Sequence, residues 1–162
     1  MEQSRAGCAY NECEIGVKVK LGFVLLVLLL ASFAFPPDDG DQVVGLWLTG
    51  EGKAKVEIYE LDDHYYGKII WSKQQEESSE ILLDINNPVD TLRTKPIIGL
   101  EILHDFVYQD DQWVNGMIYD PESGDYYRAK MMRFDDSKLR IRGYVLIPLF
   151  GRSEEWTRVF DK

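Results

Sequence analysis

Apolar and polar residues alternate with a period of two along most of the chain after residue 42. In residues 53–61, for example, Val56 and Ile58 alternate with Lys55 and Glu57. A period of two places one set of side chains on each face of a half-buried β-strand. No segment shows a 3.6-residue apolar period over three helical turns. The pattern therefore predicts an all-β protein.

Eight such runs follow one another, separated by turn residues. They span residues 43–49, 53–61, 64–72, 100–108, 113–119, 125–134, 139–147 and 155–160. Most of the joining segments are short enough for hairpins, so consecutive strands should pair antiparallel. Such a sheet can close on itself and lose its unpaired edges. We expect an eight-stranded antiparallel up-and-down barrel, with a two-sheet β-sandwich as the alternative.

One long connection, residues 73–96, interrupts this rhythm. It begins with polar residues, continues through a turn-forming Asp84-Ile85-Asn86-Asn87-Pro88 stretch and ends beyond Asp90, which could cap a single helical turn. Connections of this length in compact domains are often functional or mobile.

The front of the chain has the features of a signal segment, which we assign to residues 1–34. Residues 21–35 are apolar, a run that suits a secretory signal better than a membrane-spanning helix. Lys18 and Lys20 precede it, and Ser32 and Ala34 supply the small residues of a cleavage site. We expect cleavage after Ala34, with an uncleaved anchor as the alternative.

Three further expectations concern the organisation of the chain. Residues 1–16 carry acids that are unusual in a signal segment, so a mis-assigned start is an alternative interpretation, with initiation at Val17 or Val19. Residues 35–42 form an acidic linker, and residues 43–162 form a single β-barrel domain. No stable membrane span should remain after cleavage.

Charge and cysteine content narrow the chemistry. The formal net charge is −10, which argues against nucleic acid and anionic lipid as partners. The two cysteines, Cys8 and Cys13, both precede the apolar run. The exported domain would therefore have no disulfide, cysteine-bound zinc or thiol nucleophile.

Two groups of residues resemble known families. Gly45-Leu46-Trp47 in the first strand and Arg158 in the last resemble the calycin superfamily, which includes lipocalins and fatty-acid-binding proteins. In those barrels the arginine packs across the tryptophan, a cation–π contact, and closes one end. The resemblance implies a calycin-like barrel with Trp47 and Arg158 as its structural closure.

A closer resemblance covers nearly all of the exported part. The motifs are Gly52-Lys53-Ala54-Lys55-Val56, Asn86-Asn87-Pro88 with Leu92-Arg93, Tyr119-Asp120-Pro121 with Gly124, and Ile141-Arg142-Gly143-Tyr144 with Phe150-Gly151-Arg152. In this order they resemble the bacterial domain-of-unknown-function family numbered 2147. That resemblance implies a calycin-type barrel exported to the periplasm or the outside. It does not indicate a biochemical activity, because none is established for the family.

Arg142 and Tyr144 are the leading candidates for ligand contacts. Residues two apart on a strand project to the same side, so these side chains, with Arg140, would form a basic and aromatic stripe. Facing a cavity, the stripe suits an anionic head group. Facing water, it is an ordinary solvated strand face.

Glu101 and Arg152 are candidates for polar support of the same site. Glu101 lies between Leu100 and Ile102, so its carboxylate points either outward or inward. If it is inward, a buried charge needs a partner, and Arg142 or Arg152 could supply one. The outward orientation is the alternative that we favour.

Catalytic and metal signatures are weak. His64 and His104 have no histidine or cysteine companions at metal-binding spacing, and no nucleophile elbow or phosphate-binding loop occurs. Asp84-x-Asn86-Asn87 offers clustered oxygens but lacks the remainder of a calcium loop, and it is more typical of a turn. We predict no enzyme activity, no metal and no cofactor.

The sequence thus favours an exported protein that binds a small amphipathic or anionic ligand in the mouth of its barrel. The alternative is a cell-envelope interaction or structural module that uses residues 73–96. Whether the barrel interior is hollow, which it must be for a ligand to enter, is left open by the sequence, as is the oligomeric state.

Overall fold

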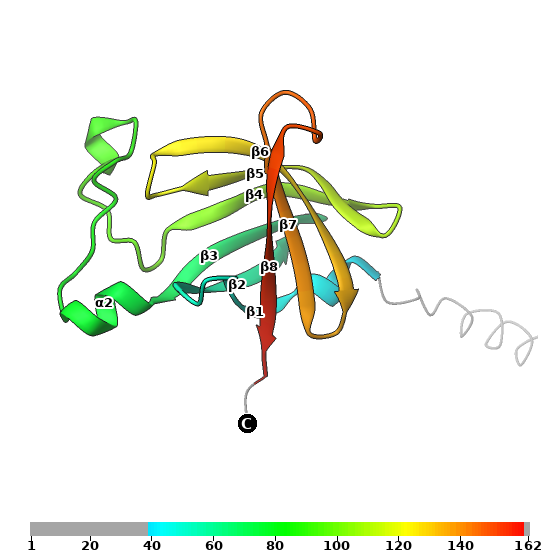
Figure 1. Ribbon diagram of the computed structural model, residues 1–162, viewed down its shortest axis with the longest axis horizontal. Coiled ribbons are helices and arrows are strands. Elements are labelled where there is room, and N and C mark those ends of the chain that lie inside the picture. The colour runs from blue at the N-terminus through cyan, green and yellow to red at the C-terminus, as the bar shows by residue number, and fades with distance from the viewer. Residues whose placement is uncertain (1–38, 161–162) are drawn as a thin grey trace, which may run out of the picture. The chain divides into compact units, whose positions relative to one another are not determined.

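The computed structural model describes residues 39–160 and shows a closed antiparallel barrel whose eight strands are paired in chain order (Figure 1). The strands are β1 (Gly45–Leu48), β2 (Ala54–Leu61), β3 (His64–Ser72), β4 (Glu101–Gln109), β5 (Gln112–Asp120), β6 (Asp125–Asp135), β7 (Lys138–Tyr144) and β8 (Gly151–Val159). The predicted barrel is confirmed, and the sandwich is excluded. The predicted signal segment 1–34 lies outside the described residues.

Tight turns between strands account for the up-and-down order. Asp62 and Asp63 join β2 to β3 with backbone φ angles of 53° and 62°. Asp110 and Asp111 join β4 to β5 with φ angles of 50° and 59°. Two successive left-handed residues match the twist of a two-residue hairpin, and aspartate tolerates that conformation better than most residues.

The barrel closes where β1 pairs with β8, and Trp47 lies directly opposite Arg158 in that ladder. The guanidinium carbon of Arg158 is 4.4 Å from the centre of the Trp47 ring. Burial lowers the pKa of Arg158, with a smaller contribution from the nearby positive charge of Arg133. Trp47 and Arg158 thus form the predicted structural closure.

A short 3-10 helix, η1 (Asp39–Val43), packs against this closed end. Trp113 Nε1 donates to the carbonyl of Gly40 at 3.1 Å, and Trp47 Nε1 donates to the carbonyl of Val43 at 2.8 Å. Because buried indole N–H groups need acceptors, these bonds fix η1 to the barrel. Residues 39–42, which were predicted to belong to an acidic linker 35–42, thus lie in or beside a helical turn that packs on the barrel, and residues 35–38 lie outside the described residues.

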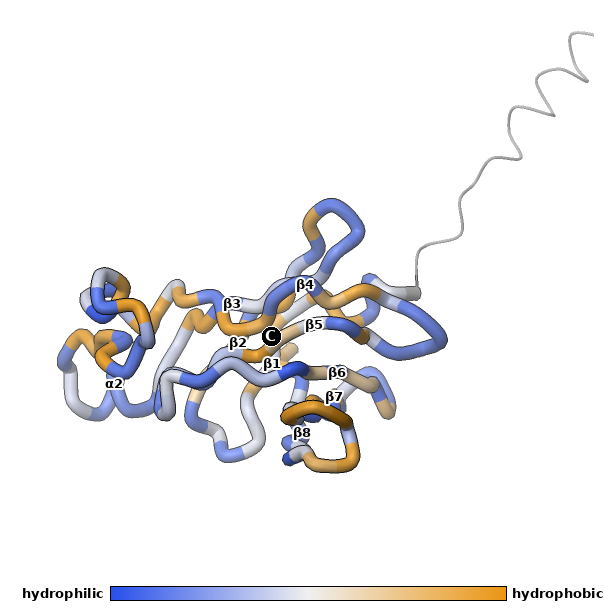
Figure 2. The backbone as a smooth tube through the Cα atoms, turned by 90° about the horizontal axis from the view of Figure 1, so that it is seen from above, coloured by the Kyte–Doolittle hydropathy of each residue, from blue (hydrophilic) through white to orange (hydrophobic). Residues whose placement is uncertain are grey.

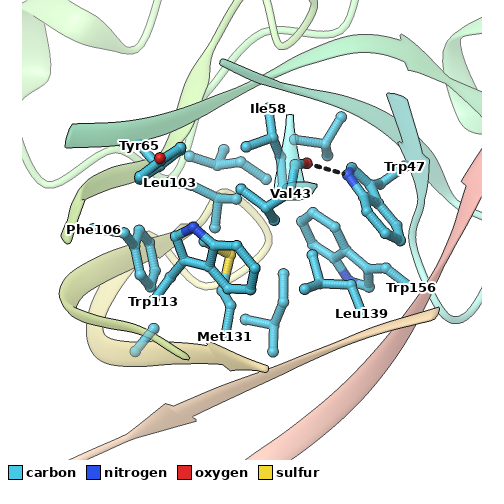
Figure 3. Packing of buried hydrophobic residues seen from close by; sticks show 14 of the residues in the cluster. Val43, Trp47, Ile58, Tyr65, Leu103, Phe106, Trp113, Met131, Leu139 and Trp156 are labelled. Carbon is cyan, nitrogen blue, oxygen red and sulfur yellow. Dashed lines mark hydrogen bonds between the residues drawn. The ribbon is translucent and has the colours of Figure 1, made fainter. Parts of the chain in front are cut away.

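Large aromatic side chains fill the barrel interior beside this closed end (Figure 3). Trp47, Trp113 and Trp156 are each at most 2% exposed, and Tyr65 and Phe106 pack among them. The ring centres of Tyr65 and Trp113 are 6.2 Å apart in an edge-to-face arrangement. Aromatic packing of this kind makes a core and occupies the space in which lipocalin-like barrels could hold a ligand.

The connection from β3 to β4 contains a helix that the apolar period did not indicate. This helix, α2 (Lys73–Ser78), is capped by the Ser72 hydroxyl, which accepts from the backbone N–H of Gln75. The Ser72-x-x-Gln75 spacing is the capping-box pattern and could have predicted it. Among residues 39–160, no helix is long and apolar enough to cross a membrane.

A second helical turn in the same connection, η2 (Asp90–Leu92), confirms the turn expected near residue 90. Asp90 is its first residue, however, and Val89 occupies the cap position without a side-chain hydrogen bond. The predicted capping role of Asp90 is therefore wrong. Its carboxylate instead pairs with Arg93 at 2.7 Å.

The hairpin of β7 and β8 is divided differently from the prediction. The strands were expected to run to residue 147 and from residue 155, whereas β7 ends at Tyr144 and β8 begins at Gly151. Pro148 has no N–H for a ladder, and Leu146 has a φ of 66°. Residues 145–150 therefore form an irregular loop, here called the β7–β8 loop.

Candidate ligand-binding site

The strand that was predicted to carry ligand contacts has its polar face on the outside of the barrel. Ile141 is buried in the core, so alternation places Arg142 and Tyr144 on the opposite, outer face of β7. Gly143, on the inner side, has Ile118 and Tyr127 as neighbours. The two predicted contacts share a face, and that face is not the barrel interior.

Arg142 is engaged by the β7–β8 loop. Its Nε donates to the Pro148 carbonyl at 2.6 Å, and its Nη2 donates to the Leu149 carbonyl at 3.2 Å. Its Nη1 donates to the hydroxyl of Ser153 at 2.9 Å. These hydrogen bonds from Arg142 hold the loop in place. A planar guanidinium can donate to three acceptors at once.

Tyr144 lines a hollow of about 240 Å³ on this outer face. The hollow lies over β5, β6 and β7 and is bounded on one side by the β7–β8 loop. Its lining residues are Met117, Tyr126, Arg128, Tyr144, Val145 and Leu146. It combines apolar and aromatic walls with one cation, the composition expected for an amphipathic anion.

Arg128 is the functional candidate that sequence analysis missed. It is exposed, and its guanidinium makes no hydrogen bond or ion pair within residues 39–160. Arg128 and Tyr144 are direct partners in the β6–β7 ladder, while Arg128 and Met117 are partners in the β5–β6 ladder. The Tyr126-x-Arg128 spacing signals a shared face, but only the ladder brings that pair beside Tyr144.

Glu101 lies on a different part of the surface. Its carboxylate accepts from the hydroxyl of Tyr59 at 2.5 Å and lies 2.9 Å from Nδ1 of His104. Burial and the hydrogen bond to Glu101 raise the pKa of Tyr59 to about 12. Lys68 is the partner of Glu101 in the β3–β4 ladder, so the two side chains lie on the same face of the sheet. Since the Lys68 side chain is exposed, that face is the outer one, and the favoured outward orientation of Glu101 is confirmed.

His104 forms the link between Glu101 and the hollow. Its ring centre is 6.0 Å from that of Tyr126, and Met117 is its partner in the β4–β5 ladder. An imidazole oriented by a carboxylate is a common arrangement for a general base. Here Nε2 of His104 is buried and has no hydrogen-bond partner within the described residues, so that nitrogen does not face an open site.

Arg152 is exposed on β8 and pairs in register with Gly143. It shares the strand face of Trp156, four residues further on, and therefore lies toward the barrel axis at the end opposite η1. Lys53 lowers the pKa of the nearby Glu51 carboxyl, and Arg152 makes a smaller contribution. Of the four predicted site residues, only Tyr144 lines the hollow, and Glu101 and Arg152 lie elsewhere.

A buried polar cluster fixes the long connection to β5. Asp84 is fully buried and accepts from the Tyr119 hydroxyl at 2.7 Å and from Asn87 Nδ2 at 2.6 Å. Asn86 donates at 2.9 Å to the carbonyl of Glu122 in the β5–β6 turn. The oxygens considered for a calcium loop are thus used within the fold, as buried polar groups require.

Comparison with known proteins agrees with this architecture. The sequence model of a bacterial family, described as "Uncharacterized protein conserved in bacteria (DUF2147)", matches residues 45–158. A solved structure, the protein HP1028 from Helicobacter pylori, which is described as belonging to the lipocalin family, superposes with a TM-score of 0.66. Its sequence is 22% identical, and the match covers 74% of this chain and 84% of that one. No curated protein sequence matches this chain.

Proposed function

Because this chain belongs to the DUF2147 family and has a lipocalin-like barrel, we propose that it is a non-enzymatic binding protein for a small amphipathic anion. The observation that carries the proposal is Arg128, a cation without a partner among the described residues, on the wall of an apolar and aromatic hollow. The sequence predicted a ligand in the barrel mouth, whereas the proposed site lies on the outer face beside the β7–β8 loop.

The hollow favours a particular class of ligand. A volume of about 240 Å³ is slightly below the roughly 300–1,000 Å³ of typical small-molecule sites. It suits a head group and a short apolar segment better than a whole fatty acid. Arg128 would pair with a carboxylate, sulfonate or phosphate of the ligand, while Met117, Val145 and Leu146 would contact its apolar part.

A fluorescent carboxylate tests this proposal. We expect dansylglycine, a compact aromatic carboxylate, to bind, and its methyl ester to bind more weakly because Arg128 loses its anionic partner. Arg128→Gln should raise the Kd of the carboxylate about tenfold and leave the Kd of the ester unchanged. Arg140→Gln is the matched control, because Arg140 lies outside the hollow in an exposed ion pair with Glu155. Equal affinities of both probes for the wild type would contradict the proposal.

The proposed compartment is the periplasm or the outside of the bacterial cell, with cleavage after Ala34. Amino-terminal sequencing of the protein recovered from a periplasmic fraction tests this directly. A mature chain that begins at Phe35 is the expected result, and a full-length chain in the cytoplasm would contradict it.

A second candidate function is a cell-envelope interaction module built on residues 73–96. Its support is a row of exposed apolar side chains on a connection whose backbone is fixed by the Asp84 cluster: Ile81, Leu83, Ile85 and Val89 are 40–71% exposed. A photo-crosslinking residue at Ile85 should give a defined protein adduct in living cells, and one at the exposed Leu61 should not. Equal labelling at both positions would count against this candidate.

A further inference from the structure

The β7–β8 loop exposes an unusual amount of apolar surface. Leu146, Leu149 and Phe150 are 81%, 76% and 70% exposed, and Val145 and Ile147 are 58% and 49% exposed. In Figure 2 this connection, beside the labels of β7 and β8, is coloured as strongly hydrophobic. Single exposed apolar residues are ordinary on a protein surface, whereas a contiguous group marks a contact site.

The backbone of this loop is largely paired within the molecule. Ile147 N–H donates to the Val145 carbonyl at 2.8 Å, Phe150 N–H donates to the Ile147 carbonyl at 3.1 Å, and Val145 N–H donates to the Phe150 carbonyl at 3.4 Å. Arg142 supplies donors to the carbonyls of Pro148 and Leu149. Five of the six loop carbonyls and three of the five loop N–H groups therefore have partners within residues 39–160.

Internal pairing matters for the medium that the loop can enter. In water, a loop carbonyl can bind solvent, so nothing requires it to be paired. In an apolar medium, each unpaired backbone group is costly, and only segments with satisfied backbones are accepted. By pairing two loop carbonyls, the Arg142 contacts lower the cost of moving the apolar loop tip from water into an apolar medium.

The charge around the loop differs from that of the whole chain. Arg128, Arg142 and Arg152 lie on β6, β7 and β8 at the loop end of the hairpin. None of them has a carboxylate within ion-pair distance among residues 39–160, although the chain carries a net charge of −10. By contrast, Arg93, Arg133 and Arg140 each pair with an acid.

We infer that the β7–β8 loop docks on the surface of an anionic lipid bilayer. Leu146, Leu149 and Phe150 would enter the boundary between head groups and acyl chains, and the three arginines would contact anionic head groups. The net negative charge opposes this approach only weakly, because charges beyond about 8–10 Å are screened at physiological salt. The inference goes beyond small-ligand binding and does not depend on it.

Vesicle flotation tests the inference with the purified protein. We expect the wild type to float with vesicles of mixed phosphatidylglycerol and phosphatidylcholine and to remain below with phosphatidylcholine alone. Leu149→Ser with Phe150→Ser should lower the partition coefficient about tenfold or more, because both side chains would lose their apolar insertion. These residues do not line the hollow, so binding of the dansyl carboxylate should be unchanged.

The matched control is Leu61→Ser with Phe134→Ser, which removes one exposed leucine and one exposed phenylalanine away from the loop. It should float like the wild type. Equal loss in both double variants, or no flotation of the wild type, would overturn the inference. So would a wild-type dimer that the Leu149 and Phe150 changes dissociate without any vesicle binding, since a second copy would then cover the loop.

The Arg142→Lys variant distinguishes the effect of the positive charge on vesicle binding from the effect of the hydrogen bonds that hold the loop. Lysine keeps the positive charge but cannot donate to Pro148, Leu149 and Ser153 together. We expect the partition coefficient to fall about threefold or more, with an unchanged thermal unfolding midpoint confirming that the barrel is intact. A partition coefficient equal to that of the wild type would overturn the part assigned to Arg142.

Discussion

Arg158 lies over Trp47 and at the same time holds the backbone that enters the barrel. Its Nη1 donates to the Val44 carbonyl at 2.9 Å, and its Nη2 donates to the Gln42 carbonyl. The same guanidinium therefore joins the last strand, the first strand and η1. One side chain therefore stabilises both the pairing that closes the sheet and the attachment of η1 at one end of the barrel.

Arg158→Ala should be among the most destabilising single changes on the barrel surface. We expect the free energy of unfolding to fall by about 2–3 kcal/mol, because two charged hydrogen bonds and the cation–π contact are lost together. Urea denaturation measures it. Arg140→Ala, which removes an exposed ion pair, should cost about 1 kcal/mol or less. Similar losses in the two variants would contradict the closure role.

Tyr119→Phe should weaken the attachment of the long connection. The change leaves one oxygen of the buried Asp84 carboxylate without its donor, and we expect a loss of about 1–3 kcal/mol in the free energy of unfolding. Tyr127→Phe is the control, since its hydroxyl makes only a 3.5 Å contact with the exposed Asp125. Hydrogen exchange in residues 84–87 should accelerate only in the Tyr119 variant.

Two glycines with left-handed backbones should respond differently to alanine. Gly124 has a φ of 79°, and a Cβ there would lie 2.0 Å from the backbone oxygen of Asn86. Gly52 has a φ of 67° and nothing within 4 Å of such a Cβ. Gly52→Ala should cost about 1 kcal/mol from backbone strain alone. Gly124→Ala should cost clearly more in thermal unfolding, because a backbone atom must move, and equal costs would show that the connection is loosely held.

Stability should fall at alkaline pH in a way that depends on Tyr59. Its pKa is raised to about 12 in the folded protein, against about 10 in the unfolded chain, so the folded state holds this proton more tightly. The resulting stabilisation is fully present below pH about 10 and is lost as the pH rises toward 12. The stability difference between the wild type and Tyr59→Phe should shrink across that window, and a constant difference would be the contrary result.

The alternation of residues determined the strands, because a period of two specifies a face directly, and the short connections indicated their antiparallel order. Only the tertiary structure decided between a closed barrel and a two-sheet sandwich, because closure depends on the pairing of β1 with β8, which lie far apart in the sequence. The resemblance of Gly45-Leu46-Trp47 and Arg158 to calycins likewise implied the contact that closes the barrel. Boundaries were less secure where several apolar residues follow one another, as at 145–150, since such a run fits a strand or an exposed loop equally well.

The tertiary structure alone decided where the candidate site lies. Spacing places Arg142 and Tyr144 on one side of a strand, but it cannot say whether that side faces the core. The burial of Ile141 in the structure shows that this side faces outward. The strand register then brings Arg128 beside Tyr144, and the fold of the loop brings its carbonyls to Arg142. These contacts join residues on different strands and loops, and their distances depend on how the whole sheet closes rather than on any local pattern.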